Sequence, residues 1–220
     1  MLFRSYIKSY NFHKIYIELL NFCTLDLSAF YFDIKKDILY CDSENSQRRN
    51  NCLEILNVLI NFLLKWFSPI LAFTSEEAYQ VIKNKKYKSI HLQDFPVIPF
   101  MWNNSEIKNK WIGIKKVKQV VNAAIEDIRN KKIIGSSLEA NVIVYLKDEY
   151  LNIIKQEDLS EIFICSEAKA ESFINQNDLF SLKDVEGVAV KILKAKGQKC
   201  SRCWKILEKP CSRDICGLKN

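Results

Sequence analysis

The fold class of this chain is decided by Gln47–Phe67, which reads QRRNNCLEILNVLINFLLKWF. Its apolar side chains recur at helical spacing, at Cys52, Ile55, Leu56, Leu59, Leu63, Trp66 and Phe67. Asn57, Asn61 and Lys65 lie four residues apart and form a single polar stripe. One polar stripe on an otherwise apolar helix is typical of the middle of a helical bundle and not of a membrane span.

Helical spacing recurs on both sides of this stretch. Phe12–Cys23 and Leu27–Ile38 each carry apolar residues three or four apart, which predicts two separate helices before Gln47. A long helix is predicted at Ser105–Lys132. Five lysines fall mostly on its polar side: Lys108, Lys110, Lys115, Lys116 and Lys118. A lysine face of this kind follows a phosphate backbone in some proteins and is only solvated in others, and both interpretations stand.

Local signals also predict where the helices begin and end. Ser43 or Ser46 can cap the helix that follows the polar segment after Cys41. Pro69 should end that helix, because the residue before a proline disfavours helical geometry. Thr74-Ser-Glu-Glu77 has the spacing of a capping box, which predicts that a short helix begins there.

After Gly135 the helical period is lost. Val142–Leu146, Ile162–Cys165 and Val188–Leu193 are short β-rich runs, and Asp148–Lys155 between the first two has helical spacing. We therefore predict a mainly α chain in which a helical bundle is followed by a small α+β unit.

The C-terminal segment Lys196–Asn220 has a composition of its own. It contains four of the eight cysteines: Cys200, Cys203, Cys211 and Cys216. Two residues separate Cys200 from Cys203, which places two thiolates on one tight turn, as in the first half of a tetrahedral zinc site. Seven lysine and arginine residues outnumber two acidic ones here. A basic knuckle that is held together by a metal ion and carries one aromatic residue indicates nucleic-acid binding. The alternative is a knuckle that binds the metal ion and no other ligand.

The whole chain narrows the classes of function. Its net charge of +7 suits an acidic partner, although abundant lysine also reflects an AT-rich genome. His13 and His91 are the only histidines and the five glycines are scattered, so we predict no catalytic residue. The start of the chain lacks the apolar core of a signal peptide, and the remaining cysteines fit buried thiols, so we expect a cytoplasmic protein without a membrane partner.

The chain resembles the C-terminal region of the isoleucyl-tRNA synthetase family, which belongs to the class I aminoacyl-tRNA synthetases. The resemblance rests on Asn21–Asp42 (NFCTLDLSAFYFDIKKDILYCD), Arg48-Arg49, Trp66–Ala78 (WFSPILAFTSEEA), His91–Pro96 (HLQDFP), Ile134–Ala140 (IGSSLEA) and Gln198–Lys205 (QKCSRCWK). These stretches follow one another in the family's order and extend over nearly the whole chain. Several helical features are shared with valyl- and leucyl-tRNA synthetases, whereas the knuckle points to the isoleucine enzyme.

The resemblance implies three parts and a partner. Residues 1–134 correspond to the anticodon-binding helical domain, which starts within its first helix, 135–195 to an α+β junction, and 196–220 to a zinc knuckle. Bundle and knuckle then bind the anticodon arm of isoleucine tRNA, tRNA(Ile). The family's ATP-dependent catalytic motifs need histidines and a methionine that this sequence cannot supply. The chain alone is therefore expected to be inactive, as a fragment or split-gene piece, with ATP used only by the full-length enzyme.

The resemblance also implies roles for single residues. The family's first C-x-x-C pair corresponds to Cys200 and Cys203, and Cys216 can begin its second pair. One structural zinc ion is expected on these three residues, with Cys211 completing the set through a longer loop; a degraded or truncated site is the alternative. The family has a second C-x-x-C pair where this chain has Lys219 in place of the last cysteine, and a protonated lysine is a poor zinc ligand. The residues expected to contact RNA are Lys199, Arg202, Trp204 and Lys205. Trp204 either stacks on an anticodon base or packs inward over the zinc sulfurs, and both interpretations stay open.

Two other functions compete with this hypothesis. The first is a free-standing RNA-binding module derived from a synthetase. The second is a protein-docking domain that binds a separate catalytic subunit, the catalytic part of the same enzyme. A dedicated module should begin at a domain edge, and this sequence begins within a helix, which favours the fragment.

Overall fold

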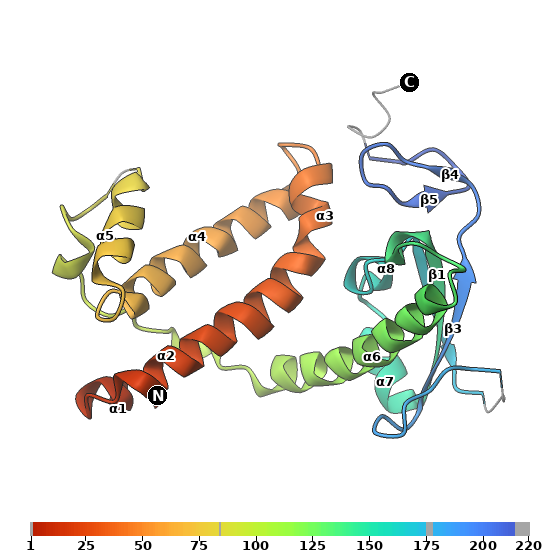
Figure 1. Cartoon of the computed structure of the whole chain (residues 1–220), viewed down its shortest axis with the longest axis horizontal. Helices are drawn as coiled ribbons and strands as arrows, with labels where there is room; N and C mark the ends of the chain where they lie inside the picture. The colour runs from red at the N-terminus through yellow and green to blue at the C-terminus, as the bar shows by residue number, and fades with distance from the viewer. Residues whose placement is uncertain (1, 84, 175–177, 214–220) are drawn as a thin grey trace. The chain divides into compact units, whose positions relative to one another are not determined.

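The computed structural model describes residues 2–83, 85–174 and 178–213, with the backbone alone for 2–4 (Figure 1). It divides into two compact units. The first consists of Met1–Leu39 and Glu44–Trp102, and the second of Tyr40–Ser43 and Asn103–Asn220. The described chain is mainly helical, with a small sheet in the second unit, as the sequence predicts. The domain boundaries expected after residues 134 and 195 stay predictions.

The first unit begins with a short helix, α1 (Leu2–Lys8), and a long helical run. Three segments follow one another in that run without a break: α2 (Phe12–Asn21), the π-helical η1 (Phe22–Phe32) and α3 (Asp33–Cys41). The prediction of two separate helices was therefore wrong. No glycine or proline lies between Phe12 and Cys41, so the backbone has no residue that ends a helix there.

This helical run is also apolar. By length and composition alone, Phe12–Cys41 is the one described helix that could cross a membrane, and only 17% of its most apolar window is buried. That is weak evidence, because a core helix of a protein in water passes the same test. The absence of a membrane partner stays a prediction.

The next helix, α4 (Gln47–Phe67), begins and ends where the sequence predicts. Ser46 is its N-cap, and the Ser46 hydroxyl accepts a hydrogen bond of 3.5 Å from the backbone N–H of Arg49. Cys52 and Leu64 on this helix are buried. Ile55, one of the apolar residues at helical spacing, is about half exposed.

The capping box predicted at Thr74–Glu77 does not form. The helix α5 (Ala72–Val81) begins two residues before Thr74, and its N-cap, Leu71, has no side-chain bond. Glu76 instead bonds forward to the 3₁₀ turn η2 (Ile90–Leu92): it accepts hydrogen bonds from the Ser89 hydroxyl (2.8 Å) and the Ile90 N–H (3.0 Å). The box fails because α5 begins at Ala72, so Thr74 lies inside the helix and not at its N-cap.

A small apolar core lies between these elements. Leu64, Tyr79 and Ile90 are buried together, and the Tyr79 hydroxyl donates to the carbonyl of Tyr87 over 3.0 Å. The unit ends with a second 3₁₀ turn, η3 (Phe100–Trp102).

The second unit is built on α6 (Ser105–Asn130), which Asn104 caps through its side-chain oxygen. The buried face of α6 includes Ile114, Val117, Val121 and Ile125, and it packs against the sheet. The helix is followed by the 3₁₀ turn η4 (Ser137–Glu139).

The sheet has three strands in the order β2-β1-β3. The central strand β1 (Ala140–Leu146) pairs in parallel with β2 (Glu167–Ser172) and antiparallel with β3 (Val188–Lys194). Two short helices, α7 (Asp148–Ile154) and α8 (Leu159–Ile162), lie in the crossover between β1 and β2. A parallel pair requires such a crossover, because a tight turn can join only antiparallel strands.

Two sequence-based predictions fail in this unit. Ile162–Cys165 is not a strand but the end of α8 and the turn after it, and its residues are apolar because Ile162, Phe163 and Cys165 belong to the core. Lys118 is not on the wet side of α6. Its side chain is buried, and its ammonium donates to the carbonyl of Ile162 over 2.5 Å.

Candidate metal centre and nucleic-acid interface

A small hairpin follows the sheet, and its two strands are β4 (Gln198–Lys199) and β5 (Ile206–Leu207). Its turn is closed by a hydrogen bond from the Cys200 N–H to the Lys205 carbonyl (2.9 Å) and by one from the Trp204 N–H to the Cys200 carbonyl (3.0 Å). Gly197 leads into β4 with φ of +118°, and a Cβ at this position would collide with the carbonyl of Leu207. Only glycine fits there.

This turn brings three cysteines together. The sulfur atoms of Cys200, Cys203 and Cys211 all lie within 4.8 Å of one another. Cys203 is buried and the other two are half-buried. Three convergent sulfurs are the donor set of a tetrahedral zinc site with one ligand still to be supplied. Cys216, the predicted fourth ligand, lies outside the described residues.

The thiol of Cys203 is held in its protonated form by its surroundings. Burial raises the pKa of Cys203 to about 12, against an ordinary value of 9.0. A metal ion that binds this cluster must displace the proton, because the thiolate is the ligand. Binding of a metal ion by these sulfurs would therefore release protons.

Trp204 follows the second cysteine and points into solvent. It is 60% exposed, which leaves much of the ring open to solvent. The Lys199 ammonium lies 5.9 Å from the centre of the ring, within the range of a cation–π contact. The pair presents an aromatic face next to a positive charge.

The backbone of Trp204 is in the left-handed region, with φ of +63°. A residue with a Cβ is about 1–2 kcal/mol less favourable there than in the right-handed region, whereas glycine adopts either readily. A bulky aromatic residue is therefore held in a conformation that favours glycine. Tyr10, Lys132 and Ile164 share this left-handed conformation, so the backbone geometry by itself assigns no function to Trp204.

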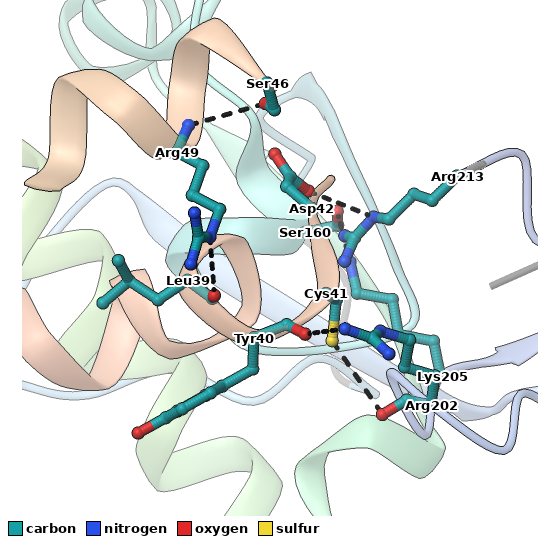
Figure 2. A network of polar contacts seen from close by, with 10 residues as sticks. All are labelled: Leu39, Tyr40, Cys41, Asp42, Ser46, Arg49, Ser160, Arg202, Lys205 and Arg213. Carbon is teal, nitrogen blue, oxygen red and sulfur yellow. Dashed lines mark hydrogen bonds and ion pairs between the residues drawn. The ribbon is translucent and has the colours of Figure 1, made fainter. Parts of the chain in front are cut away.

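Arg202 is engaged with the end of α3. Its guanidinium donates a hydrogen bond of 2.7 Å to the carbonyl of Tyr40, and its own carbonyl lies 3.9 Å from the thiol of Cys41, which donates to it (Figure 2). Nearby, Arg213 pairs with Asp42 at 3.7 Å. The last carbonyls of a helix carry partial negative charge, which a cation stabilises. The guanidinium of Arg202 therefore already has a hydrogen-bond acceptor within the second unit.

Lys205 differs from the other predicted RNA-binding residues. Its side chain is only 9% exposed, and its ammonium donates to the hydroxyl of Ser160 at 3.1 Å. A side chain buried in this way has a structural partner inside the protein. Lys205 connects the hairpin to α8 in the structure.

The hairpin belongs to a strongly basic stretch. Residues 188–213 contain eight lysine and arginine residues and one acidic residue, Glu208. Four of the lysines are exposed and precede the first cysteine: Lys191, Lys194, Lys196 and Lys199. The aromatic ring of Trp204 is thus surrounded in the sequence by positive charge.

Comparison with known proteins decides the family. The family described as "Anticodon-binding domain of tRNA ligase" matches residues 3–146. The chain belongs to this family. It is 47% identical over 211 residues to an isoleucine–tRNA ligase of Pelagibacter ubique, and the alignment covers 96% of this chain and 22% of that protein. It is 40% identical over 199 residues to the isoleucine–tRNA ligases of Ruegeria pomeroyi and Agrobacterium fabrum, covering 90% of this chain and 20% of each.

This anticodon-binding family member therefore spans about a fifth of the length of the curated relatives it matches. The matched residues run from α1 through β1 and so include both the helical unit and the beginning of the sheet. The recognition made from the sequence is confirmed.

Sequence reasoning missed the residues that hold the hairpin in place. Besides Ser160, these include Ser166, whose hydroxyl accepts a hydrogen bond of 2.7 Å from the Ile206 N–H. The carbonyl of Tyr40, which binds Arg202, also belongs to this group. Each lies 40 or more residues from its partner, so no local spacing could have identified it.

Proposed function

We propose that this chain binds the anticodon arm of isoleucine tRNA and acts as the C-terminal part of an isoleucine–tRNA ligase. Similarity to isoleucine–tRNA ligases over 96% of the chain supports the partner. The catalytic step, in which ATP and isoleucine are consumed, belongs in this proposal to the rest of the enzyme. The proposal places the chain in the cytoplasm, where tRNA is charged.

The exposed ring of Trp204 beside Lys199 is the observation that carries the proposal. Unpaired bases of an RNA loop stack on aromatic faces, and each stacked base contributes about 1–3 kcal/mol of binding free energy. A lysine beside the ring adds attraction for the phosphate that follows the base. Arg202 and Lys205, engaged with Tyr40 and Ser160, keep this surface in place and contribute positive potential around it.

The proposal includes one structural zinc ion held by Cys200, Cys203 and Cys211, with Cys216 as the fourth ligand. The donor set supports it, because three sulfurs within 4.8 Å fit the preference of zinc for thiolates. The ion would stabilise the turn that carries Trp204. It takes no part in the chemistry of aminoacylation.

Replacement of Trp204 tests the RNA contact. Trp204→Gly should relieve the left-handed strain and keep the hairpin folded, while the affinity for an anticodon stem-loop of tRNA(Ile) falls by between about fivefold and a hundredfold. Trp204→Phe keeps an aromatic face and should retain most of the affinity. Fluorescence anisotropy at several salt concentrations measures both, with the zinc content of each variant determined in parallel.

The outcomes separate the competing functions. An affinity for RNA that Trp204→Gly leaves unchanged contradicts the stacking role, and loss of zinc together with affinity assigns Trp204 to the metal site. A wild-type chain that binds no RNA at any salt concentration, and that binds a separately expressed catalytic part, is instead a docking domain.

The zinc site is tested by metal analysis. The wild-type chain should contain about one zinc ion, and Cys203→Ser or Cys211→Ser should lose it. Cys23→Ser is the matched control, since this half-buried cysteine lies on η1 in the first unit. A wild-type chain without zinc, or a Cys203→Ser variant that keeps it, contradicts the assigned site.

A further inference from the structure

Trp204 lies between residues that are fixed to other parts of the second unit. Cys203 before it is buried in the sulfur cluster. The ammonium of Lys205 after it is bonded to Ser160, and the N–H of Ile206 is bonded to the hydroxyl of Ser166. A residue keeps an unfavourable backbone conformation only where its surroundings determine that conformation. These anchors are therefore the candidates for what holds Trp204 at φ of +63°.

Ser166 is the best placed of the anchors. Its side chain is about 5% exposed, and its hydroxyl donates to the carbonyl of Leu138 over 2.5 Å while it accepts from Ile206 over 2.7 Å. Its own N–H donates to the carbonyl of Ala140 at the start of β1. One hydroxyl thus joins the hairpin to the rigid sheet, with both of its hydrogen-bonding roles satisfied.

We propose that Ser166 is a positioning residue for RNA binding: it holds the strand after Trp204 so that the aromatic ring faces solvent in one orientation. This inference rests on the proposed function, in which Trp204 stacks on an RNA base. Ser166 itself is buried and makes no contact with RNA.

The effect on affinity follows from preorganisation. When the binding-competent orientation is populated only part of the time, the measured affinity is reduced by that fraction. With the Ile206 N–H released, the turn can relax toward a right-handed conformation of Trp204, and the ring points elsewhere. Ser160 gives the same support through Lys205, as a second and independent anchor.

A double-mutant cycle on the full chain tests the inference. Ser166→Ala should weaken binding of the tRNA(Ile) anticodon stem-loop by about three- to tenfold and leave the zinc content unchanged. In the Trp204→Gly background the same substitution should have almost no further effect on affinity, because Ser166 acts on RNA binding only by orienting the ring of Trp204. Ser172→Ala at the exposed end of β2 is the matched control and should change nothing.

A second measurement does not depend on RNA. The indole N–H signal of Trp204, assigned by its loss in Trp204→Gly, should broaden or shift in Ser166→Ala and stay sharp in Ser172→Ala. If Trp204→Gly leaves RNA binding unchanged, the proposed function fails, while this signal still decides whether Ser166 orients the ring.

Three results overturn the inference. An equal loss of affinity in both backgrounds shows a general structural role, and an unchanged indole signal shows that Ser166 does not orient Trp204. If Ser166→Ala does not fold, Ser160→Ala takes its place, because it removes the partner of Lys205 and leaves the Ser166 bond intact. An unchanged affinity and indole signal in that variant then contradict the anchoring of Trp204.

Discussion

The two compact units use apolar residues in different ways. In the second unit, α6 and the sheet bury a contiguous core, which includes Val117, Val144 and Phe163. The core found in the first unit is Leu64, Tyr79 and Ile90, while Phe73 and Phe100 are almost fully exposed. The second unit thus holds its shape by burial. The first unit has a smaller clustered core, further buried residues such as Ile15 and Ile38, and polar contacts such as those of Glu76 and Tyr79.

This difference matters for the proposed site. The side chains of an RNA-binding surface must be held close to their binding geometry, which requires a rigid support. The hairpin with Trp204 is bonded to the unit that has the large core. The contrast between the units can be tested by pairs of matched substitutions.

The largest effect is expected from a pair of phenylalanines. Phe163, 2% exposed, lies in the core of the second unit, and Phe73, 92% exposed, lies on α5. Phe163→Ala should lower the free energy of unfolding of the second unit by about 3–5 kcal/mol, through lost burial and a cavity. Phe73→Ala should change the first unit by no more than about 0.5 kcal/mol. Urea denaturation followed by circular dichroism measures both, and equal losses would remove the contrast between the units.

A smaller loss is expected where the hairpin begins. Gly197→Ala should destabilise the hairpin by about 2 kcal/mol or more, because an alanine is strained at a φ of +118° and its Cβ meets the Leu207 carbonyl. Gly135→Ala is the matched control, since a Cβ there meets Glu139 at an ordinary 3.4 Å. The rate at which Cys203 reacts with a thiol reagent should rise in the first variant alone. An unaltered rate would show that the hairpin does not need this glycine.

Removal of the Tyr79 hydroxyl tests one of the polar contacts of the first unit. Tyr79→Phe removes the hydrogen bond to the Tyr87 carbonyl and leaves an acceptor without its donor, so the unit should lose about 1 kcal/mol. Tyr10→Phe is the control, because Tyr10 is 80% exposed. Thermal unfolding of the two variants should separate them by a few degrees. Identical midpoints would mean that the hydrogen bond between Tyr79 and the Tyr87 carbonyl does not stabilise the unit.

The smallest effect is expected from pH. Hydrogen bonds from Ser89 and then Gln80 hold the pKa of Glu76 below its ordinary value of 4.5. A carboxylate with a lowered folded-state pKa contributes stability above its ordinary pKa and loses that contribution as the pH falls through the lowered value. As the pH falls below 4.5, the unfolding temperature of the first unit should therefore decrease more steeply in the wild type than in Glu76→Gln. Glu77→Gln, on an exposed neighbour, should follow the wild type, and a matching slope for Glu76→Gln would contradict the assignment.

Several predictions that rested on local signals held, although the local capping box at Thr74–Glu77 did not form. The ends of α4 were predicted from Ser46 and Pro69, and α7 was found at Asp148–Ile154 from its helical spacing. The cysteine pair likewise predicted a cluster, because two residues between Cys200 and Cys203 place both sulfurs on one turn. In each case the deciding residues lie within a few positions of one another, and backbone geometry alone connects them.

Predictions failed where a distant partner decided the outcome. Ile162–Cys165 was predicted to be a strand, because a short apolar run does not distinguish a buried strand from a buried helix end. Lys118 was placed on a wet face, whereas the Ile162 carbonyl 44 positions away satisfies its ammonium inside the protein. A lysine pattern along a helix cannot show which of its members has such a partner.

The amino-acid sequence by itself determined most of the helices and the cysteine turn, since each depends on residues close together in the chain. It also determined the family resemblance, through short stretches distributed along the chain. Only the tertiary structure decided that Trp204 points outward while the next residue, Lys205, points inward. Neighbouring residues share the same local sequence signals. Which of them is buried depends on hydrogen-bond partners 40 or more positions away in the chain. The hydroxyls of Ser160 and Ser166 are those partners, and they give this short turn its orientation.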